Sequence, residues 1–252
     1  MSRLLAHLAM YDRPETAAAT DRYWAAIQAH LGYGPTSLTR GGDVWDIWTD
    51  TNLLLTQTCG YPYRARLHGQ VQLVGTPDYG LPDCPPGHYN SAIIVHQDAQ
   101  IHNPSDLNGR SFAYNESLSQ SGWAAPKTWM DDHGIHPGET RQSGAHVNSA
   151  RMVAERQADF AALDAQTWRM VQRFDGFAAN LRILAHTPPT PGLPYITAPG
   201  QNAKTLFGAV AAAITDLDPA DRDLLGLRGI VSISSPAYLA IPSPAEPTNV
   251  AQ

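Results

Sequence analysis

The stretch Ser111–Trp168 reads SFAYNESLSQSGWAAPKTWMDDHGIHPGETRQSGAHVNSARMVAERQADFAALDAQTW, and it repeats one pattern three times. A short apolar run is followed by a polar turn and then by a segment with helical spacing. The three polar turns contain Ser119-Gln120-Ser121-Gly122, Ser143-Gly144-Ala145-His146 and Asp164. Alternating strands and helices predict an α/β fold, in which the carboxyl ends of parallel strands face a ligand crevice. We therefore expect the three turns to lie together.

The chemistry of these turns favours a small anion as the ligand. Serine hydroxyls, the Gln120 amide and the His146 ring can all donate hydrogen bonds, and helix N-termini add unpaired backbone N–H groups. Asp164 indicates a second end of the ligand that is cationic or hydroxylated. The serines and Asp164 also have a purely structural interpretation, because serine is a preferred N-cap residue and Asp164 can cap the helix that begins near Gln166. A single histidine such as His146 can equally be a capping or core residue.

The rest of the chain predicts two lobes with a ligand cleft between them. The expected strands lie at residues 4–10, 53–55, 71–74, 92–95 and near 195, and the expected helices follow Asp12 and span Ala203 to Leu217. This order favours a mainly parallel sheet in the first part. Lobe one is expected to hold residues 1–96 plus 190–252, and lobe two residues 97–189. The proline-rich tail from Pro242 to Gln252 is expected to be loosely ordered.

Composition excludes several classes of function. The 252 residues carry a net charge of −6 without a basic run, so we expect no nucleic-acid partner. The longest apolar runs are far too short for membrane insertion. Neither a nucleotide-binding glycine motif nor a ligand-spaced metal cluster occurs, so no cofactor and no metal are expected. Two cysteines, Cys59 and Cys84, permit one disulfide without requiring it. The N-terminus lacks the apolar core of a signal peptide, because His7 interrupts it.

Four segments of the chain resemble the phosphonate- and phosphite-binding proteins of ABC transporters. Asp106–Ala113 resembles the turn and strand of type 2 periplasmic-binding-protein folds. Ser119–Trp123 resembles the Ser-Thr-Ser-Gly-Tyr turn of that family, and Ser143–His146 resembles its Ser-Gly-Ser-His turn. Gln157–Asp164 resembles the helix-to-strand passage that ends in an acidic residue. The resemblance implies a two-lobe type 2 fold with a ligand cleft between the lobes.

The resemblance also implies the binding residues. The Ser-Thr-Ser-Gly turn maps to Ser119, Gln120, Ser121 and Gly122, and the histidine that meets the phosphonate maps to His146. The acidic residue that holds a ligand amine in the family maps to Asp164, and the tyrosines that the family contributes from lobe one map to Tyr11 and Tyr61. Gln120 departs from the family pattern, because it replaces the central hydroxyl with a longer amide. That substitution also allows a sulfonate, a carboxylate or a larger ligand.

The function that the resemblance implies is non-enzymatic capture of a small oxyanion for ABC-type uptake. The ligand is a phosphonate, phosphite or related organic anion, and the protein partner is an ABC permease. The family is periplasmic, whereas the absence of a recognisable signal peptide in this sequence also allows a cytoplasmic location. Two alternatives follow: a cytosolic ligand-sensing protein, and an enzyme built on the same fold with Cys59 and His146 as the reactive couple.

Overall fold

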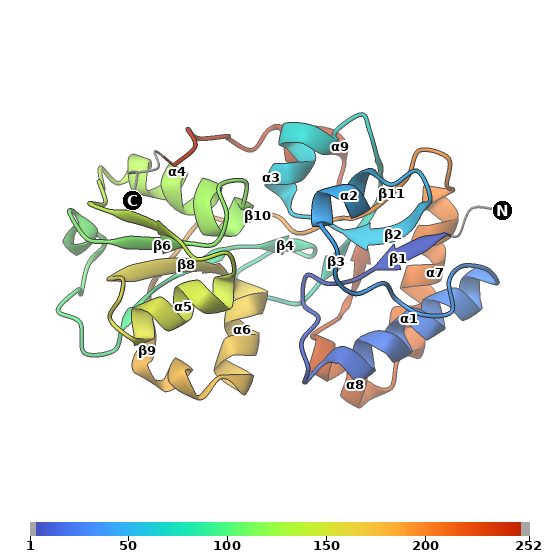
Figure 1. Ribbon diagram of the computed structural model, residues 1–252, viewed down its shortest axis with the longest axis horizontal. Coiled ribbons are helices and arrows are strands. Elements are labelled where there is room, and N and C mark those ends of the chain that lie inside the picture. Colours follow the sequence, from blue (N-terminus) through green and yellow to red (C-terminus); the bar gives the residue numbers. More distant parts are fainter. Residues whose placement is uncertain (1–3, 248–252) are drawn as a thin grey trace. The chain divides into compact units, whose positions relative to one another are not determined.

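The computed structural model describes residues 4–247, which divide into two compact units (Figure 1). Unit 1 holds residues 4–88 and 191–240, and unit 2 holds residues 89–190 and 241–247. The sequence analysis placed the first boundary after residue 96 and assigned the tail to lobe one. The boundary lies earlier because Ser91–His96 is a strand within the sheet of unit 2. The tail beyond Ala240 also belongs to unit 2.

Unit 1 is built on a five-stranded sheet with the strand order β1-β2-β11-β3-β12. Its strands are β1 (Leu5–His7), β2 (Leu53–Gln57), β3 (Gln72–Asp78), β11 (Tyr195–Thr197) and β12 (Gly229–Val231). β1 pairs parallel to β2, but β11 pairs antiparallel to both of its neighbours, β2 and β3. The expected mainly parallel sheet is therefore mixed. β11 belongs to the segment that returns from unit 2, and it enters the sheet from the opposite end.

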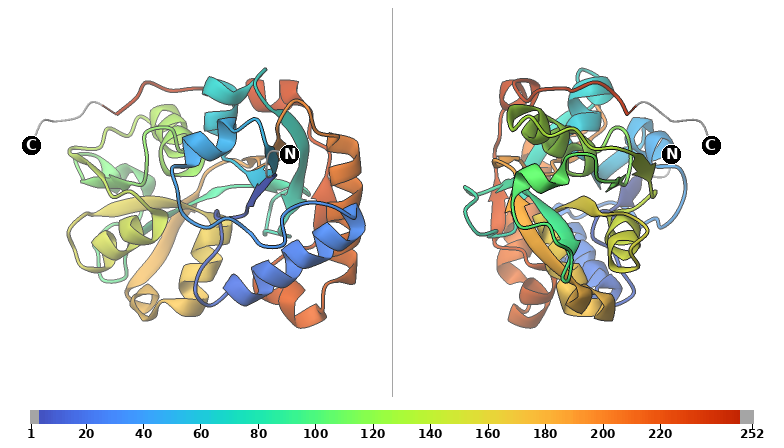
Figure 2. Two further views of the ribbon diagram at one scale, coloured as in Figure 1. Left: turned by 45° about the vertical axis from the view of Figure 1, so that its right-hand side comes forward. Right: turned by 90° about the vertical axis from the view of Figure 1, so that its left-hand side faces the viewer.

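Helices surround this sheet. They are α1 (Ala17–Leu31), α2 (Val44–Thr49), α3 (Gly60–Pro62), the π-helical η1 (Tyr63–Leu67), α7 (Ala203–Asp216), α8 (Pro219–Leu225) and α9 (Ser235–Leu239). α1 ends as the sequence predicts, because Gly32 adopts a left-handed φ of 74° that a side chain disfavours. α1 and α7 pack against each other, and α7 also lies along β3 and β12 (Figure 2).

Unit 2 contains a second five-stranded sheet with the order β7-β6-β8-β5-β9. Its strands are β5 (Ser91–His96), β6 (Phe112–Tyr114), β7 (Thr140–Gln142), β8 (Phe160–Asp164) and β9 (Leu181–His186). β7, β6 and β8 run parallel, whereas β5 is antiparallel to β8 and β9. A two-stranded sheet pairs β4 (His88–Tyr89) with β10 (Thr190–Pro191), where the chain passes between the units.

Helices cover both faces of the unit 2 sheet, with α5 and α6 on one face and η3 and α4 on the other (Figure 1). The helices are η2 (Pro104–Leu107), η3 (Gln120–Ala124), α4 (Ala125–Asp132), α5 (His146–Ala154), α6 (Ala165–Phe174) and η4 (Gly176–Asn180). η2 and η4 are 3-10 helices, and η3 is a π-helical turn that continues directly into α4. No helix within residues 4–247 is long and apolar enough to cross a bilayer.

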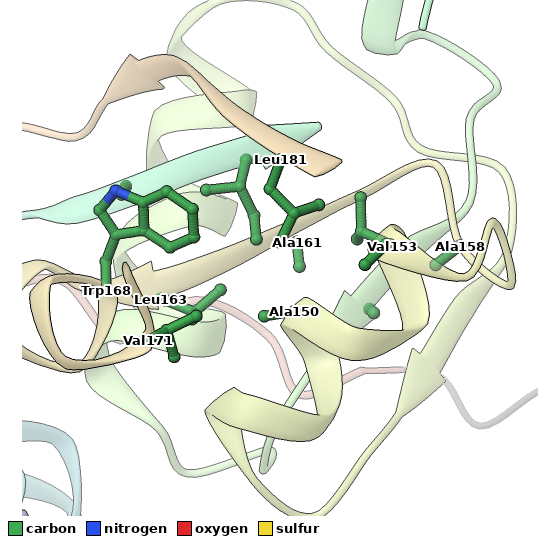
Figure 3. Packing of buried hydrophobic residues seen from close by; sticks show 12 residues of the cluster. Ala150, Val153, Ala158, Ala161, Leu163, Trp168, Val171 and Leu181 are labelled. Atoms are coloured by element: carbon green, nitrogen blue, oxygen red, sulfur yellow. The ribbon is translucent and has the colours of Figure 1, made fainter. Parts of the chain in front are cut away.

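The core of unit 2 explains why its three central strands, β6, β8 and β5, are almost continuously apolar. Ala161 and Leu163 of β8 point toward α5 and α6, where they meet Val153, Trp168 and Val171 (Figure 3). On the opposite face, aromatic rings of β6, β8 and η3 stack against one another. Because strands covered on both faces have no solvent side, period-two alternation is lost. Each fully buried aliphatic side chain contributes about 1.5–3 kcal/mol.

Candidate anion site in unit 2

The three polar turns lie together at one edge of the unit 2 sheet. β7, β6 and β8 are adjacent and parallel, so their carboxyl ends meet at the same edge. η3 follows β6, α5 follows β7 and α6 follows β8. The sequence prediction that these turns converge is borne out within unit 2, where side-chain contacts join all three.

The turn after β6 begins with a capping hydrogen bond. Ser119 is the N-cap of η3, and its Oγ accepts a hydrogen bond of 3.0 Å from the Gly122 N–H. The structural interpretation of Ser119 is therefore correct, although its hydroxyl proton is still available to a ligand. The Gly122 N–H is engaged by this cap, and ligand contact by Gly122 stays a prediction. Gln120 and Ser121 follow in the first turn, and both are buried.

Ser121 and His146 connect the first turn to the second. Ser121 Oγ lies 3.0 Å from His146 Nε2. His146 is the first residue of α5, and Ala145, its N-cap, is in an extended conformation. Ser143 holds the turn before it, since its hydroxyl lies 2.7 Å from Ser149 Oγ and donates to the Ala145 carbonyl. The ring of His146 is therefore presented to Ser121 by a turn with its own internal hydrogen bonds.

Asp164 brings in the third turn. It is the N-cap of α6, and its Oδ1 accepts from the Thr167 N–H at 2.9 Å, as the structural interpretation of the sequence expected. Its other oxygen, Oδ2, lies 3.7 Å from His146 Nε2. Ser121 and Asp164 therefore face the same ring nitrogen. In a Ser-His-Asp catalytic triad the serine and the carboxylate bind opposite nitrogens, so this cluster does not have that arrangement.

The protonation state of His146 follows from its surroundings. Burial lowers the pKa of His146 below its usual value, and the nearby Asp164 carboxylate and the backbone of Ala162 only partly offset this. The ring is therefore neutral near pH 7. The tautomer of the ring sets the direction of the contact between Ser121 Oγ and His146 Nε2, since either atom can be the donor. When the proton lies on Nε2, the Ser121 hydroxyl proton is left for a ligand.

Gly122 has a steric role at the site. A Cβ at this position would lie 1.8 Å from Asn115 Oδ1 and 3.1 Å from His146 Cε1. Asn115 directly follows β6, and its Oδ1 is buried without a hydrogen-bond partner. The glycine therefore allows the Asn115 amide and the His146 ring to approach the turn. The role of Gly122 is therefore to leave space for its neighbours. The sequence pattern did not indicate that Asn115 is one of them.

Two further residues beside Asp164 were missed by the sequence analysis. The Asn90 carbonyl accepts from the Ala165 N–H at 3.0 Å, and Trp168 lies one helical turn beyond Asp164 on α6. Asn90 Oδ1 and Trp168 Nε1 are both buried and lack a hydrogen-bond partner. Buried orphan polar atoms are uncommon and indicate a place for water or ligand. The sequence signal that was available is the spacing of four residues between Asp164 and Trp168.

The predicted tyrosines lie in unit 1. Tyr11 follows β1 and packs edge-on against Tyr79, with ring centroids 5.1 Å apart. It lines a cavity of about 30 Å³, whose other lining residues are Leu8, Thr20, Tyr23, Gln57, Tyr79, Tyr195, Leu225 and Leu227. Tyr61 is buried at the start of α3, where the Arg64 guanidinium lies 4.3 Å from its ring centroid. Ligand contact by Tyr11 or Tyr61 stays a prediction.

Residues 4–247 contain no group of three or more His, Cys, Asp or Glu side chains that could hold a metal ion. Cys59 and Cys84 are not joined to each other, so the one disulfide that the sequence permits is not formed.

Comparison with known families now identifies the class of protein. Residues 52–237 match the family described as the periplasmic substrate-binding protein of the phosphonate ABC transporter. The match covers most of the chain, so the chain belongs to this family of solute-binding proteins. A comparison with curated proteins found no match.

Solved structures share the fold at low sequence identity. PhnD1 from Prochlorococcus marinus, in complex with methylphosphonate, is 16% identical with a TM-score of 0.73, and 94% of each chain is covered. A binding protein component of an ABC phosphonate transporter from Pseudomonas aeruginosa (PA3383) is 14% identical with a TM-score of 0.73; 95% of this chain and 84% of that chain are covered. XAC2383 from Xanthomonas citri, bound to ATP, is 17% identical with a TM-score of 0.69, covering 94% of this chain and 93% of that chain. The chain thus has a type 2 periplasmic-binding-protein fold.

Proposed function

We propose that this solute-binding protein captures a small organic oxyanion, a phosphonate in the first instance, at the unit 2 site. The observation that carries the proposal is the 3.0 Å contact between Ser121 Oγ and His146 Nε2. This contact joins hydrogen-bonding groups from two separate turns, and His146 Nε2 also lies 3.7 Å from Asp164 Oδ2 of the third turn. Membership of the phosphonate-binding family and the methylphosphonate complex of PhnD1 support the same ligand class.

Binding would use groups that already lie in place. A phosphonate group has only acceptor oxygens when fully ionised, so it can accept the Ser121 hydroxyl proton while His146 Nε2–H donates to Ser121 Oγ, and it can accept from Nε2–H once that contact opens. Ser119 adds a second hydroxyl proton from the same turn. Preorganised donors in a buried site interact more strongly with charge than donors in water do, because the local dielectric is lower.

Asp164 determines which oxyanions fit best. A second negative charge close to this carboxylate is unfavourable unless a positive charge lies between them. Two groups can supply that charge: a protonated His146 ring, or an ammonium group on the ligand itself. An aminoalkylphosphonate carries its own ammonium group and would satisfy Asp164 directly. We therefore expect zwitterionic phosphonates to bind more tightly than methylphosphonate of similar size.

The biological setting follows from the family. Its members deliver a solute to an ABC permease, so a small ligand and a permease are the expected partners, and the periplasm is the expected compartment. We propose that this chain binds its ligand without converting it. The shared nitrogen in the Ser121–His146–Asp164 cluster supports binding, because a serine nucleophile needs its carboxylate on the far side of the ring.

Isothermal titration calorimetry tests the proposal directly. The full chain is titrated with methylphosphonate, 2-aminoethylphosphonate, phosphite, methanesulfonate and acetate. Charge-assisted hydrogen bonds are worth about 1.5–3 kcal/mol, so His146→Ala and Ser121→Ala should each weaken phosphonate binding by roughly tenfold to a hundredfold.

The matched control is His136→Ala, because His136 is an exposed histidine of the same unit and lies outside the three turns. It should bind like the unmodified chain. Unmeasurable binding of every oxyanion by the unmodified chain, or unchanged affinity in His146→Ala and Ser121→Ala, would contradict the proposal. Chemical conversion of a ligand during the titration would favour the enzyme alternative.

A further inference from the structure

The C-terminal segment Ile241–Pro247 docks on the turn that carries Ser121. The chain leaves unit 1 after Ala240, and the segment beyond it belongs to unit 2. The indole N–H of Trp123 donates a hydrogen bond of 2.9 Å to the Ala245 carbonyl. This segment reads IPSPAEP, and it forms neither helix nor strand. Three of its seven residues are proline, which restricts the free chain and lowers the entropy lost on docking.

Trp123 is a suitable anchor for such a segment. An indole is a hydrogen-bond donor only, and a buried donor without an acceptor is costly. Trp123 is 3% exposed, and its ring stacks on Phe112 at 6.1 Å and packs against Tyr114 at 5.0 Å. Both aromatic neighbours come from β6, the strand that leads into the anion-binding turn. The acceptor for the indole N–H comes from the tail.

The position of Trp123 is directly linked to the binding groups. It lies two residues after Ser121 within η3, which is only five residues long. π-helical turns are rare and frequently occur at functional sites. A shift of the indole therefore moves the backbone that carries the Ser121 hydroxyl, whose contact with His146 is 3.0 Å long. Hydrogen bonds weaken steeply once their geometry is lost, so a small movement of η3 matters for binding.

We propose that residues 241–247 form a C-terminal strap that positions the anion-binding turn through Trp123. The proposal rests on the proposed function, since it concerns the same site. Trp123 acts as a positioning residue, and it works through the backbone of η3. The strap holds Ser121 in register with His146 before the ligand arrives, so that less ordering is needed on binding.

Thermodynamic linkage gives this proposal a consequence that a purely structural tail does not have. When docking of the strap strengthens anion binding by some factor, anion binding must strengthen docking of the strap by the same factor. The solvent exchange of the Trp123 indole N–H reports strap docking, because that proton is engaged by Ala245. Saturation with ligand should therefore slow its exchange.

The test compares two truncations and one substitution by calorimetry with methylphosphonate. Truncation after Ala240 removes the strap, and truncation after Pro247 keeps it and is the matched control. Trp123→Phe keeps an aromatic ring but loses the N–H donor. A single neutral hydrogen bond corresponds to an affinity change of about threefold to tenfold, so truncation after Ala240 and Trp123→Phe should each weaken binding by that amount. The combined variant should lose no more than either one alone.

Nuclear magnetic resonance supplies the second measurement. The Trp123 indole signal is assigned by its loss in Trp123→Phe, and its exchange rate in the full chain should fall on saturation by the same factor that truncation costs in affinity. Equal affinity of both truncations, or an indole exchange rate that ligand leaves unchanged, would overturn the strap proposal. Failure of the full chain to bind methylphosphonate or any other oxyanion would instead overturn the proposed function.

Discussion

Substitution of Gly122 by alanine is a sharp test of the site geometry. The added methyl carbon would lie 1.8 Å from Asn115 Oδ1 and 3.1 Å from His146 Cε1. Contacts below 3.0 Å do not occur between such atoms, so the Asn115 amide must rotate away. The His146 ring must also yield by a few tenths of an ångström, which lengthens or bends its 3.0 Å contact with Ser121.

The magnitude follows from two opposing effects. Overpacking of a well-filled interior costs about 1–3 kcal/mol. Alanine is better than glycine in a helical turn by about 0.5–1 kcal/mol, which offsets part of that cost. We therefore expect a net loss of roughly 1–2 kcal/mol in the free energy of unfolding. Affinity for methylphosphonate should fall by about tenfold, because a displaced His146 weakens one charge-assisted hydrogen bond.

Denaturant unfolding and calorimetric titration measure both quantities. Gly176→Ala is the matched control in the same unit, because a Cβ at Gly176 would have nothing within 4 Å. The double variant Asn115→Ala with Gly122→Ala removes the clashing oxygen and should recover part of the lost stability. The steric reasoning would be refuted if Gly122→Ala unfolded and bound ligand like Gly176→Ala, or if removal of the Asn115 amide gave no recovery.

Three further predictions concern the pH dependence of binding, the Asp159 carboxylate and the α7 helix. Burial lowers the pKa of His146, and a bound anion should raise it, so binding of methanesulfonate should take up protons. The affinity should therefore increase as pH falls below 7, by at most tenfold per pH unit. A calorimetric affinity that does not change with pH, or the same pH profile in His146→Gln, would contradict this. Asp159 accepts two hydrogen bonds of 2.8 Å from Ser111, so Asp159→Ala should lower the free energy of unfolding by about 1–3 kcal/mol in urea without changing anion affinity; a loss of affinity would argue against its structural role. Gly208→Ala lies inside α7 with open space around it and should raise the melting temperature by stabilising the fold by about 0.5–1 kcal/mol; a lowered melting temperature would show an unrecognised contact.

The pH dependence of folding has the same origin in His146 but the opposite direction, because acid weakens folding while it strengthens anion binding. Its pKa is lower in the folded chain than in the unfolded chain, so the unfolded chain binds the proton more readily. The free energy of unfolding is therefore not reduced by His146 above the ordinary histidine pKa, and it decreases as pH falls below that value. His7, whose pKa burial also lowers, acts in the same direction.

The local features were predictable because nearby residues determine them. Gly32 ends α1 in the left-handed conformation that glycine favours, and Ser119 and Asp164 cap their helices as their residue types predict. Convergence of the three turns followed from parallel pairing of β6, β7 and β8. The residues of these turns that lie together could therefore be named from sequence pattern and family resemblance, whereas their contact with a ligand stays a prediction.

Long-range contacts could not be predicted in this way. β5 and β11 are short apolar strands whose pattern does not reveal their antiparallel pairing, and the pairing of β5 within the unit 2 sheet places the unit boundary after His88 and not after residue 96. The same holds for the Trp123–Ala245 hydrogen bond, which joins residues 122 positions apart. Asn90 Oδ1 and Asn115 Oδ1 are buried without a hydrogen-bond partner because of the residues that surround them in the fold, and the sequence alone does not indicate this.

A crystal structure of the full chain with methylphosphonate is the most direct test of the central claim. We expect a phosphonate oxygen within hydrogen-bond distance of Ser121 Oγ or His146 Nε2, with the 3.0 Å contact between these atoms opened or shared with the ligand. A ligand bound elsewhere, with Ser121 and His146 still bonded only to each other, would contradict it.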